Sequence, residues 1–141
     1  MTAGSCHPKR WNERGQALAE FALVLPLVLL FIAGITEMAR AWNIKQVVTD
    51  AAREGARYTV VKDAGVDSND VKAKIMERLA LGSIETASIT IGPSADWRQT
   101  GLPMTVTVAT QFKMGLMGAL LSWAGAPSVV TISTEATMRN E

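Results

Sequence analysis

The sequence predicts an α+β protein in which one long N-terminal, membrane-spanning helix continues into a small domain with a second helix and a three-stranded antiparallel sheet. Three observations lead to this prediction. Residues 21–35 carry no charge, the stretch after them repeats apolar residues at steps of three and four, and the last third alternates apolar with polar residues. The length of 141 residues fits one ordinary domain.

Composition excludes several classes of protein. With 48% hydrophobic residues the chain has enough apolar surface to fold, and Cys6, the single cysteine, excludes a disulfide scaffold. The net charge of +1 argues against a nucleic-acid partner. His7 is the only histidine, and the body contains no Cys, no His and no glycine-rich phosphate loop. We therefore expect no enzyme, no metal, no cofactor and no small-molecule substrate.

Charge divides the chain into three segments. Residues 1–15 are a basic leader with a net charge of +2, residues 16–36 carry only Glu20, and residues 37–141 sum to zero. As a helix, residues 17–36 rise about 30 Å, enough to cross the hydrocarbon core of a bilayer. Positive charge at Lys9, Arg10 and Arg14 predicts a cytoplasmic N-terminus and an extracytoplasmic body.

Three interpretations of the apolar segment remain open. A cleaved secretory signal fits the small-x-small pattern Ala39-Arg40-Ala41. An uncleaved signal anchor needs no further feature. The third interpretation depends on Glu20, because a carboxylate near the edge of a membrane helix is costly unless it snorkels to the interface or meets a cation. Cleavage after Gly15 would give Gln16 a new ammonium group, which could pair with Glu20 of a neighbouring parallel helix.

Two blocks of sequence resemble one known family. The segment 14–26, RGQALAEFALVLP, contains Gly15, four residues, Glu20 and Phe21, the cleavage pattern of type IV prepilins of the Flp/Tad class. In its wider context this segment is similar to the N-terminal signature of TadE-like proteins. The segment 51–58, AAREGARY, resembles the second block of that family, which follows its membrane helix.

The resemblance implies a type IV pilin-like fold and the role of a minor pilin or pseudopilin of the tight-adherence pilus. It implies cleavage between Gly15 and Gln16 by a prepilin peptidase, with Glu20 and Phe21 in recognition and assembly. The implied partners are this peptidase, other pilin or pseudopilin subunits, the assembly platform and the lipid bilayer. The implied location is the bacterial inner membrane in a single pass, or the pilus at the cell surface.

The first helix is expected to run from Gln16 to about Val61. Pro26 removes one backbone hydrogen bond and predicts a kink, which either helps a subunit leave the bilayer or is only structural. Beyond the membrane, in helix 37–61, small residues four apart allow close helix packing, within one subunit or between subunits. Its predicted stripe, in which Lys45 is the one charged residue, and its small packing residues are Met38, Ala41, Trp42, Lys45, Val48, Ala51, Ala52, Gly55, Ala56 and Thr59.

The remainder of the domain 37–141 predicts a helix over 69–81, capped by Asp67 or Ser68 and ended by Gly82. Strands are expected near 84–91, 103–112 and 128–138. The apolar excursion 114–127 is too short to span a bilayer, and fits a surface helix, a loop over the core or a partner-binding patch, with core as the preferred interpretation.

Two functions from different classes follow. In the first, the protein is a processed pilin subunit that assembles through its apolar helix. In the second, it is an anchored periplasmic binding or structural module, and the helix is only a tether.

Overall fold

A computed structural model of the chain describes residues 12–60, 67–92 and 101–139. Most of the predicted leader, including Cys6 and His7, lies outside these residues. The chain divides into two compact units at the boundary between Thr36 and Glu37. We call residues up to Thr36 unit 1 and residues from Glu37 onward unit 2, and describe each by itself.

Helix α1 (Asn12–Val60) begins one turn before the predicted start at Gln16 and continues from unit 1 into unit 2. Its backbone stays helical through Pro26, and the predicted kink there stays a prediction. In unit 1 the side chains are largely exposed, as for Leu23 at 79% and Phe31 at 67%. A surface this apolar needs a non-aqueous neighbour.

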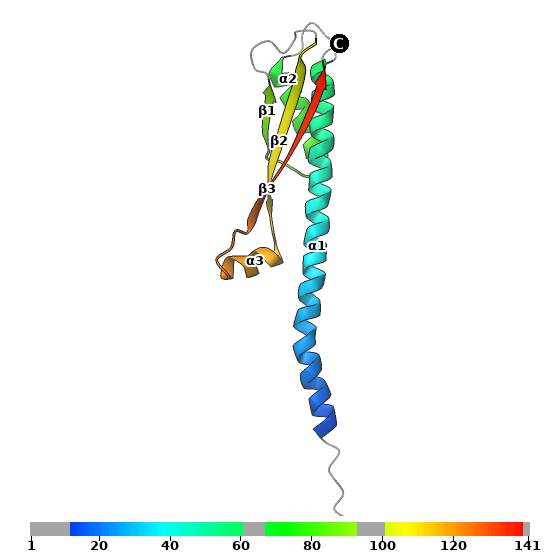
Figure 1. Cartoon of the computed structure of the whole chain (residues 1–141), viewed down its shortest axis with the longest axis vertical. Coiled ribbons are helices and arrows are strands. Elements are labelled where there is room, and N and C mark those ends of the chain that lie inside the picture. The colour runs from blue at the N-terminus through cyan, green and yellow to red at the C-terminus, as the bar shows by residue number, and fades with distance from the viewer. Residues whose placement is uncertain (1–11, 61–66, 93–100, 140–141) are drawn as a thin grey trace, which may run out of the picture. The chain divides into compact units, whose positions relative to one another are not determined.

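Unit 2 contains one three-stranded antiparallel sheet in the order β1-β2-β3, as predicted (Figure 1). Strand β1 spans Ser88–Gly92, β2 spans Pro103–Lys113 and β3 spans Val129–Arg139. In the register, Val106 of β2 lies between Ile91 of β1 and Ala136 of β3. The fold class is confirmed as α+β, with a long apolar helix, a second helix and this sheet.

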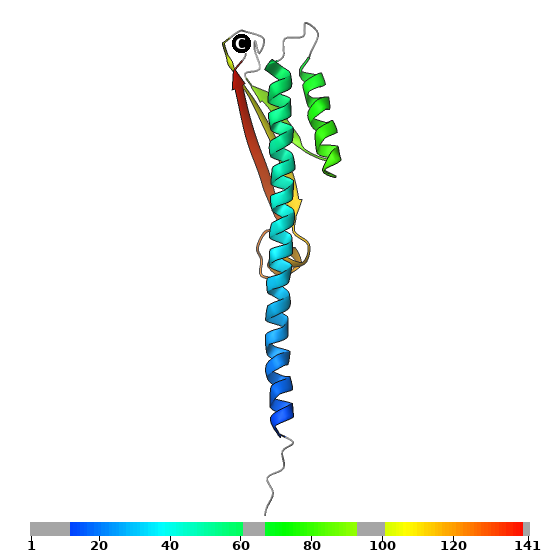
Figure 2. The ribbon, with the colours of Figure 1, turned by 90° about the vertical axis from the view of Figure 1, so that its right-hand side faces the viewer.

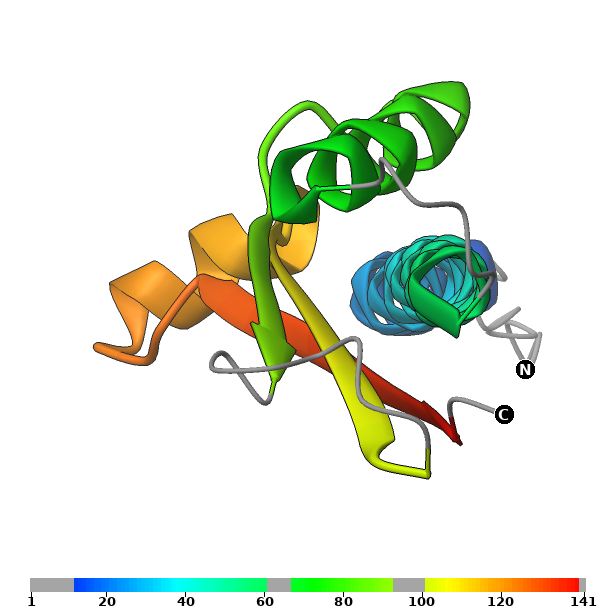
Figure 3. The same cartoon turned by 90° about the horizontal axis from the view of Figure 1, so that it is seen from above.

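One face of the sheet carries the core of unit 2. The C-terminal half of α1 and helix α2 (Ser68–Leu81) lie beside each other and cover this face (Figures 2 and 3). The buried apolar residues shared by these elements are Val48, Ala51, Ala52, Ala56, Val71, Ile75, Leu79, Ile84, Val106 and Val108. The opposite face is rich in hydroxyl groups, with the Oγ1 atoms of Thr105 and Thr137 3.0 Å apart.

Helix α2 begins within one residue of the predicted start and ends where the sequence predicts. Asp67 is its N-cap, in a capping box with Asp70. Gly82 follows the last helical residue, as predicted, with a φ of −92°, and the positive φ of 59° belongs to Ser83. Gly82 also serves packing, because a Cβ there would lie 2.5 Å from Cγ1 of Val47 on α1.

Strand β1 is shorter than the predicted 84–91 and starts at Ser88. Ile84 is buried, but its N–H donates to the carbonyl of Leu79 at 3.0 Å, so it completes the end of α2 rather than a strand ladder. The bounds of β2 and β3 lie within one residue of the predicted 103–112 and 128–138.

Two predictions about burial were wrong. The excursion 114–127 forms helix α3 (Leu116–Trp123), of which only Gly118 is buried, so it is not core. The apolar stripe of α1 is also interrupted. Its residues from Val48 onward are buried, whereas Met38 and Trp42 are 67% and 58% exposed. These exposed groups gather near the start of unit 2.

Candidate functional site

The prepilin-like motif lies in the first turns of α1. Its predicted cleavage and recognition residues, Gly15, Gln16, Glu20 and Phe21, are all exposed. One helical turn separates Gln16 from Glu20. The side-chain amide Nε2 of Gln16 donates a hydrogen bond to Oε1 of Glu20 at 3.2 Å. Phe21 is 61% exposed. The motif therefore presents an amide, a carboxylate and an aromatic ring to whatever surrounds the helix.

Gly15 has open space where a side chain would be, since a Cβ built on it meets no atom within 4 Å. The fold of the described residues therefore gives no steric reason for glycine here. Glycine costs a helix interior roughly 0.5–1 kcal/mol relative to alanine. A glycine that weakens the helix without relieving a clash fits a position where the chain must be locally unwound.

The helix that carries this motif is the one helix among the described residues that is long and apolar enough to cross a membrane. Its most apolar window has a mean hydropathy of 2.5, and only 6% of that window is buried. The core helix of a globular protein would be mostly buried. Low burial and high hydropathy together favour a helix that meets lipid or other apolar helices.

The predicted packing residues Ala52, Gly55 and Ala56 are all buried in unit 2 and are separate from the motif. A Cβ on Gly55 would lie 2.5 Å from Cδ1 of Ile75 and 3.5 Å from Cγ1 of Val106. The missing side chain lets α1 approach both α2 and β2. In this structure the small residues pack inside one subunit.

Sequence reasoning missed Glu37, the first residue of unit 2. It is only 8% exposed, and its Oε1 accepts a hydrogen bond of 3.0 Å from the backbone N–H of Met117 in the first turn of α3. Its Oε2 is buried and has no hydrogen-bond partner among the described residues. Arg40, one turn further, holds its guanidinium 5.6 Å from the ring centre of Phe112.

No sequence signal pointed to this contact, because its partners are 80 positions apart. Gly115, the N-cap of α3, has no side chain to accept the first N–H groups of the helix. A Cβ on Gly115 would lie 3.4 Å from Oε1 of Glu37 and 3.8 Å from Nη1 of Arg40. The two charged side chains therefore converge on the base of α3.

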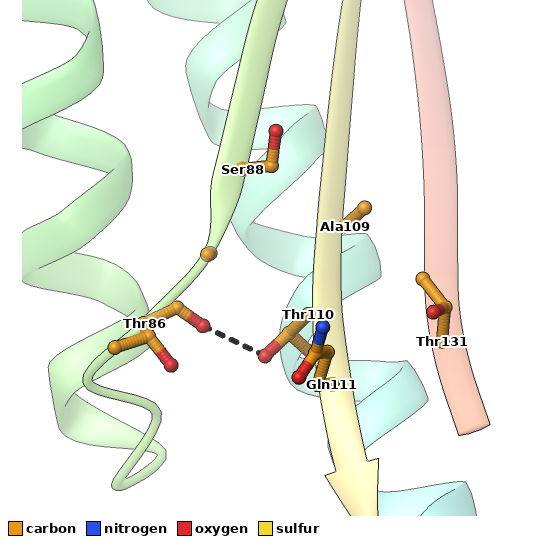
Figure 4. A pocket seen from close by; sticks show the side chains of 7 residues that line it. Thr86, Ser88, Ala109, Thr110, Gln111 and Thr131 are labelled. Carbon is orange, nitrogen blue, oxygen red and sulfur yellow. Dashed lines mark hydrogen bonds between the residues drawn. The ribbon is translucent and has the colours of Figure 1, made fainter. Parts of the chain in front are cut away.

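A hollow of about 400 Å³ lies where the sheet meets the loop before β1 (Figure 4). Its lining is uncharged and mixes apolar with polar groups, and Oγ1 of Thr110 donates to the carbonyl of Thr86 at 2.8 Å. The lining residues are Thr86, Ala87, Ser88, Ala109, Thr110, Gln111 and Thr131. This lining contains no titratable group, so it offers no acid, base or nucleophile of the usual kinds.

An exposed ion pair lies on α2. Nζ of Lys74 lies 2.8 Å from Oε2 of Glu77, and this hydrogen bond raises the pKa of Lys74 and lowers that of Glu77. Both side chains are solvated, so the pair contributes little to stability. Within the described ranges, no three His, Cys, Asp or Glu side chains are grouped so that they could hold a metal ion.

The fold and the motif together define a class: an α+β protein whose N-terminal helix could span a membrane and carries a prepilin-like sequence at its start. Comparison with protein families identifies residues 15–57 as a match to the family described as TadE-like protein. The match begins at Gly15 and includes all but the last residue of the second block, 51–58, so the resemblance seen in the sequence is confirmed. Comparisons with curated proteins and with solved structures gave no match.

The apolar helix of this chain fits a membrane-anchored protein. The matched residues cover all of the motif, the apolar segment and the small packing residues of α1.

Proposed function

We propose that the chain is a minor pilin or pseudopilin, which a prepilin peptidase processes and which takes part in assembly of a Flp/Tad-type adhesion pilus. It acts as a structural subunit rather than as a catalyst. One observation carries this proposal. Gly15, Glu20 and Phe21 stand at the start of an exposed apolar helix inside the TadE-like match.

Processing is proposed at the bond between Gly15 and Gln16. Both residues are helical in the structure, so a peptidase has to unwind the first turn before it can hold this bond extended. Glycine lowers the cost of that unwinding and lets the backbone approach an active site closely. The open space around Gly15 is what this role requires.

Glu20 is proposed to set the register between neighbouring subunits. After cleavage the new ammonium of Gln16 and the carboxylate of Glu20 would both lie in or near lipid, where each alone is costly. Pairing them between parallel helices offsets part of that cost. The hydrogen bond from Nε2 of Gln16 does not prevent this pairing, because a carboxylate accepts several hydrogen bonds.

The proposed location is the bacterial inner membrane, with the N-terminus in the cytoplasm and unit 2 outside, before transfer to a pilus. Lys9, Arg10 and Arg14 support this orientation by the preference of positive charge for the cytoplasmic side. The proposed partners are the peptidase, other pilin or pseudopilin subunits and the assembly platform.

A secretory signal cut near Ala41 is less well supported. Ala39-Arg40-Ala41 lies inside α1, and a cut there would remove Glu37, which holds Met117 of α3. It would also divide the segment 15–57 that carries the TadE-like match.

Two chimeras test whether the helix is an assembly element or only a tether. The first replaces residues 16–36 with an unrelated spanning helix, and the second replaces residues 22–36 and keeps Gly15 to Phe21. We expect both to reach the membrane, and neither to support normal piliation, because helix packing along the whole segment contributes to assembly. Normal piliation with both chimeras would leave the tether as the correct account.

A further inference from the structure

Exposed large apolar side chains in unit 2 are concentrated at its start and around α3. In the described part of unit 2, Leu81 on α2 is the one exposed large apolar side chain that lies elsewhere. We call the group the apolar patch, and its members are Met38, Trp42, Leu116, Leu120, Trp123, Val129 and Val130. In Figure 1, α3 lies at the end of the sheet away from the end of β3.

The apolar face of helix α3 points outward. Leu116, Leu120 and Trp123 are spaced four and three apart, which places them on one side of the helix, and Trp123 is 90% exposed. Gly118 lies on the opposite side and is buried. A Cβ there would lie 3.2 Å from Cβ of Met114 and 3.3 Å from Cβ of Ser128. The helix therefore packs on the residues that directly follow β2 and directly precede β3.

The base of α3 is bonded to the first residue after the predicted span. Met117 of α3 is hydrogen-bonded to Glu37, which directly follows Thr36, the last residue of the predicted span. Along the same helix, Met38 and Trp42 lie only about 3 and 9 Å beyond Thr36. These lengths compare with the roughly 5–8 Å thickness of the polar layer on each side of a bilayer.

The charges around the patch match a lipid surface. Residues 114–128 contain no charged side chain, and Lys113 directly precedes them. Glu37 and Arg40 lie at the base of α3, but the Glu37 carboxylate is buried, so Arg40 and Lys113 supply the exposed charge here. Arg40 lies over Phe112, which pairs with Val130, and Lys113 pairs with Val129, so these basic groups adjoin the patch. Tryptophan is enriched at membrane interfaces, and basic side chains near a membrane are attracted to anionic headgroups.

We propose that the apolar patch docks on the surface of the bilayer that α1 spans. Leu116, Leu120 and Trp123 enter the boundary between headgroups and acyl chains, and Arg40 and Lys113 meet phospholipid phosphates. This inference rests on the proposed membrane anchoring of α1. It adds a second membrane contact to the chain, made by an element that lies outside the TadE-like match.

Tryptophan quenching by brominated lipids tests this contact in the full chain. The sequence has four tryptophans, so a variant with the other three changed to Phe leaves Trp123 as the only reporter. The protein is placed in vesicles of phosphatidylethanolamine and phosphatidylglycerol, brominated either near the headgroups or near the chain ends. Two controls in a Trp-free background are Val28→Trp in the span and Leu81→Trp, an exposed site outside the patch.

We expect the emission of Trp123 to shift to shorter wavelength and to be quenched most by lipid brominated near the headgroups. Val28→Trp should be quenched most by lipid brominated near the chain ends, and Leu81→Trp by neither. If Val28→Trp is quenched and Trp123 is not, the proposed docking of the apolar patch is wrong, whereas the membrane anchoring of α1 stands. Blue-shifted, unquenched Trp123 also overturns the docking, since a second copy or another protein then covers the patch. An unquenched Val28→Trp rejects the anchoring itself.

Discussion

Oε1 of Glu37 accepts a hydrogen bond of 3.0 Å from the backbone N–H of Met117, and so joins the first residue of unit 2 to the start of α3. The carboxylate takes the place of an N-cap side chain, which Gly115 lacks. Capping side chains contribute roughly 0.5–2 kcal/mol, and a negative charge is favourable at a helix N-terminus. One buried carboxylate therefore orders an otherwise exposed apolar helix.

Replacing this carboxylate should loosen α3 without unfolding unit 2. We expect Glu37→Ala to raise hydrogen-exchange rates of the α3 amides by about 2- to 30-fold, from the loss of a cap. Glu37→Gln should leave them close to wild type, because its amide oxygen can still accept from Met117. The measurement is hydrogen–deuterium exchange of the full chain in lipid nanodiscs.

Asp50→Ala, at an exposed position of α1, is the matched control and should change no exchange rate in α3. Equal exchange in Glu37→Ala and wild type would show that the hydrogen bond to Met117 does not order α3.

Gly15→Ala should abolish processing while leaving the helix intact. The added methyl meets no atom within 4 Å, and alanine is the better helix former by roughly 0.5–1 kcal/mol. Any loss of cleavage then reflects the demand of the peptidase and not damage to the fold. Intact mass of the protein from cells containing the peptidase gives the fraction cleaved.

Gly34→Ala is the matched control, because a Cβ on Gly34 also meets nothing within 4 Å. It should be processed normally. If both alanine variants are cleaved like the wild type, Gly15 is not a recognition element.

Glu20→Gln should insert in the membrane at least as well as the wild type but assemble poorly. The amide removes a charge that costs about 2.5–3.5 kcal/mol at the centre of a membrane helix and less near its edge. It keeps an oxygen that can accept from Gln16, so the variant isolates the charge. Resistance to alkaline extraction measures insertion, and the amount of surface pilus measures assembly. Wild-type piliation would exclude the proposed register contact.

Gly55→Ala should destabilise unit 2 by about 1–3 kcal/mol, despite its better helix propensity, because overpacking a core is costly. Its methyl would lie 2.5 Å from Cδ1 of Ile75, which is fully buried. Ile75→Ala removes both Cδ1 and Cγ1, the second of which would lie 2.6 Å from the methyl. The double variant should therefore be more stable than the sum of the two single effects predicts. Denaturant unfolding of the full chain in detergent gives the four free energies, and strict additivity would show that these side chains do not clash.

Much of the fold could be predicted because its signals are local. Alternation placed β2 and β3 within a residue of their bounds, and Asp67 with Asp70 marked the start of α2. Gly82 marked the end of α2 correctly, but its close packing against Val47 could not be predicted, because Val47 is remote in sequence. Similarly, Ile84 has the composition of a strand residue, but its N–H is taken by Leu79.

The exposed apolar residues could not be placed from periodicity. Met38 and Trp42 follow the same stripe as Val48, but the core covers only the later part of it. The apolar composition of α3 likewise predicted that this segment belongs to the core, whereas only Gly118 of the helix is buried. Hydrophobic pattern predicts which residues avoid water, and does not tell whether protein or lipid covers them. The motif from Gly15 to Phe21 could be found in the sequence because all of its residues lie close together in the chain at a fixed spacing.

The most direct test of the proposed function is the N-terminus of the mature protein. Intact mass and N-terminal sequencing are compared for protein recovered from cells with and without their own prepilin peptidase. A start at Gln16 only when the peptidase is present is the result that this account predicts. A start at Met1 or Thr2 in both cells, or a start near Trp42, would contradict it.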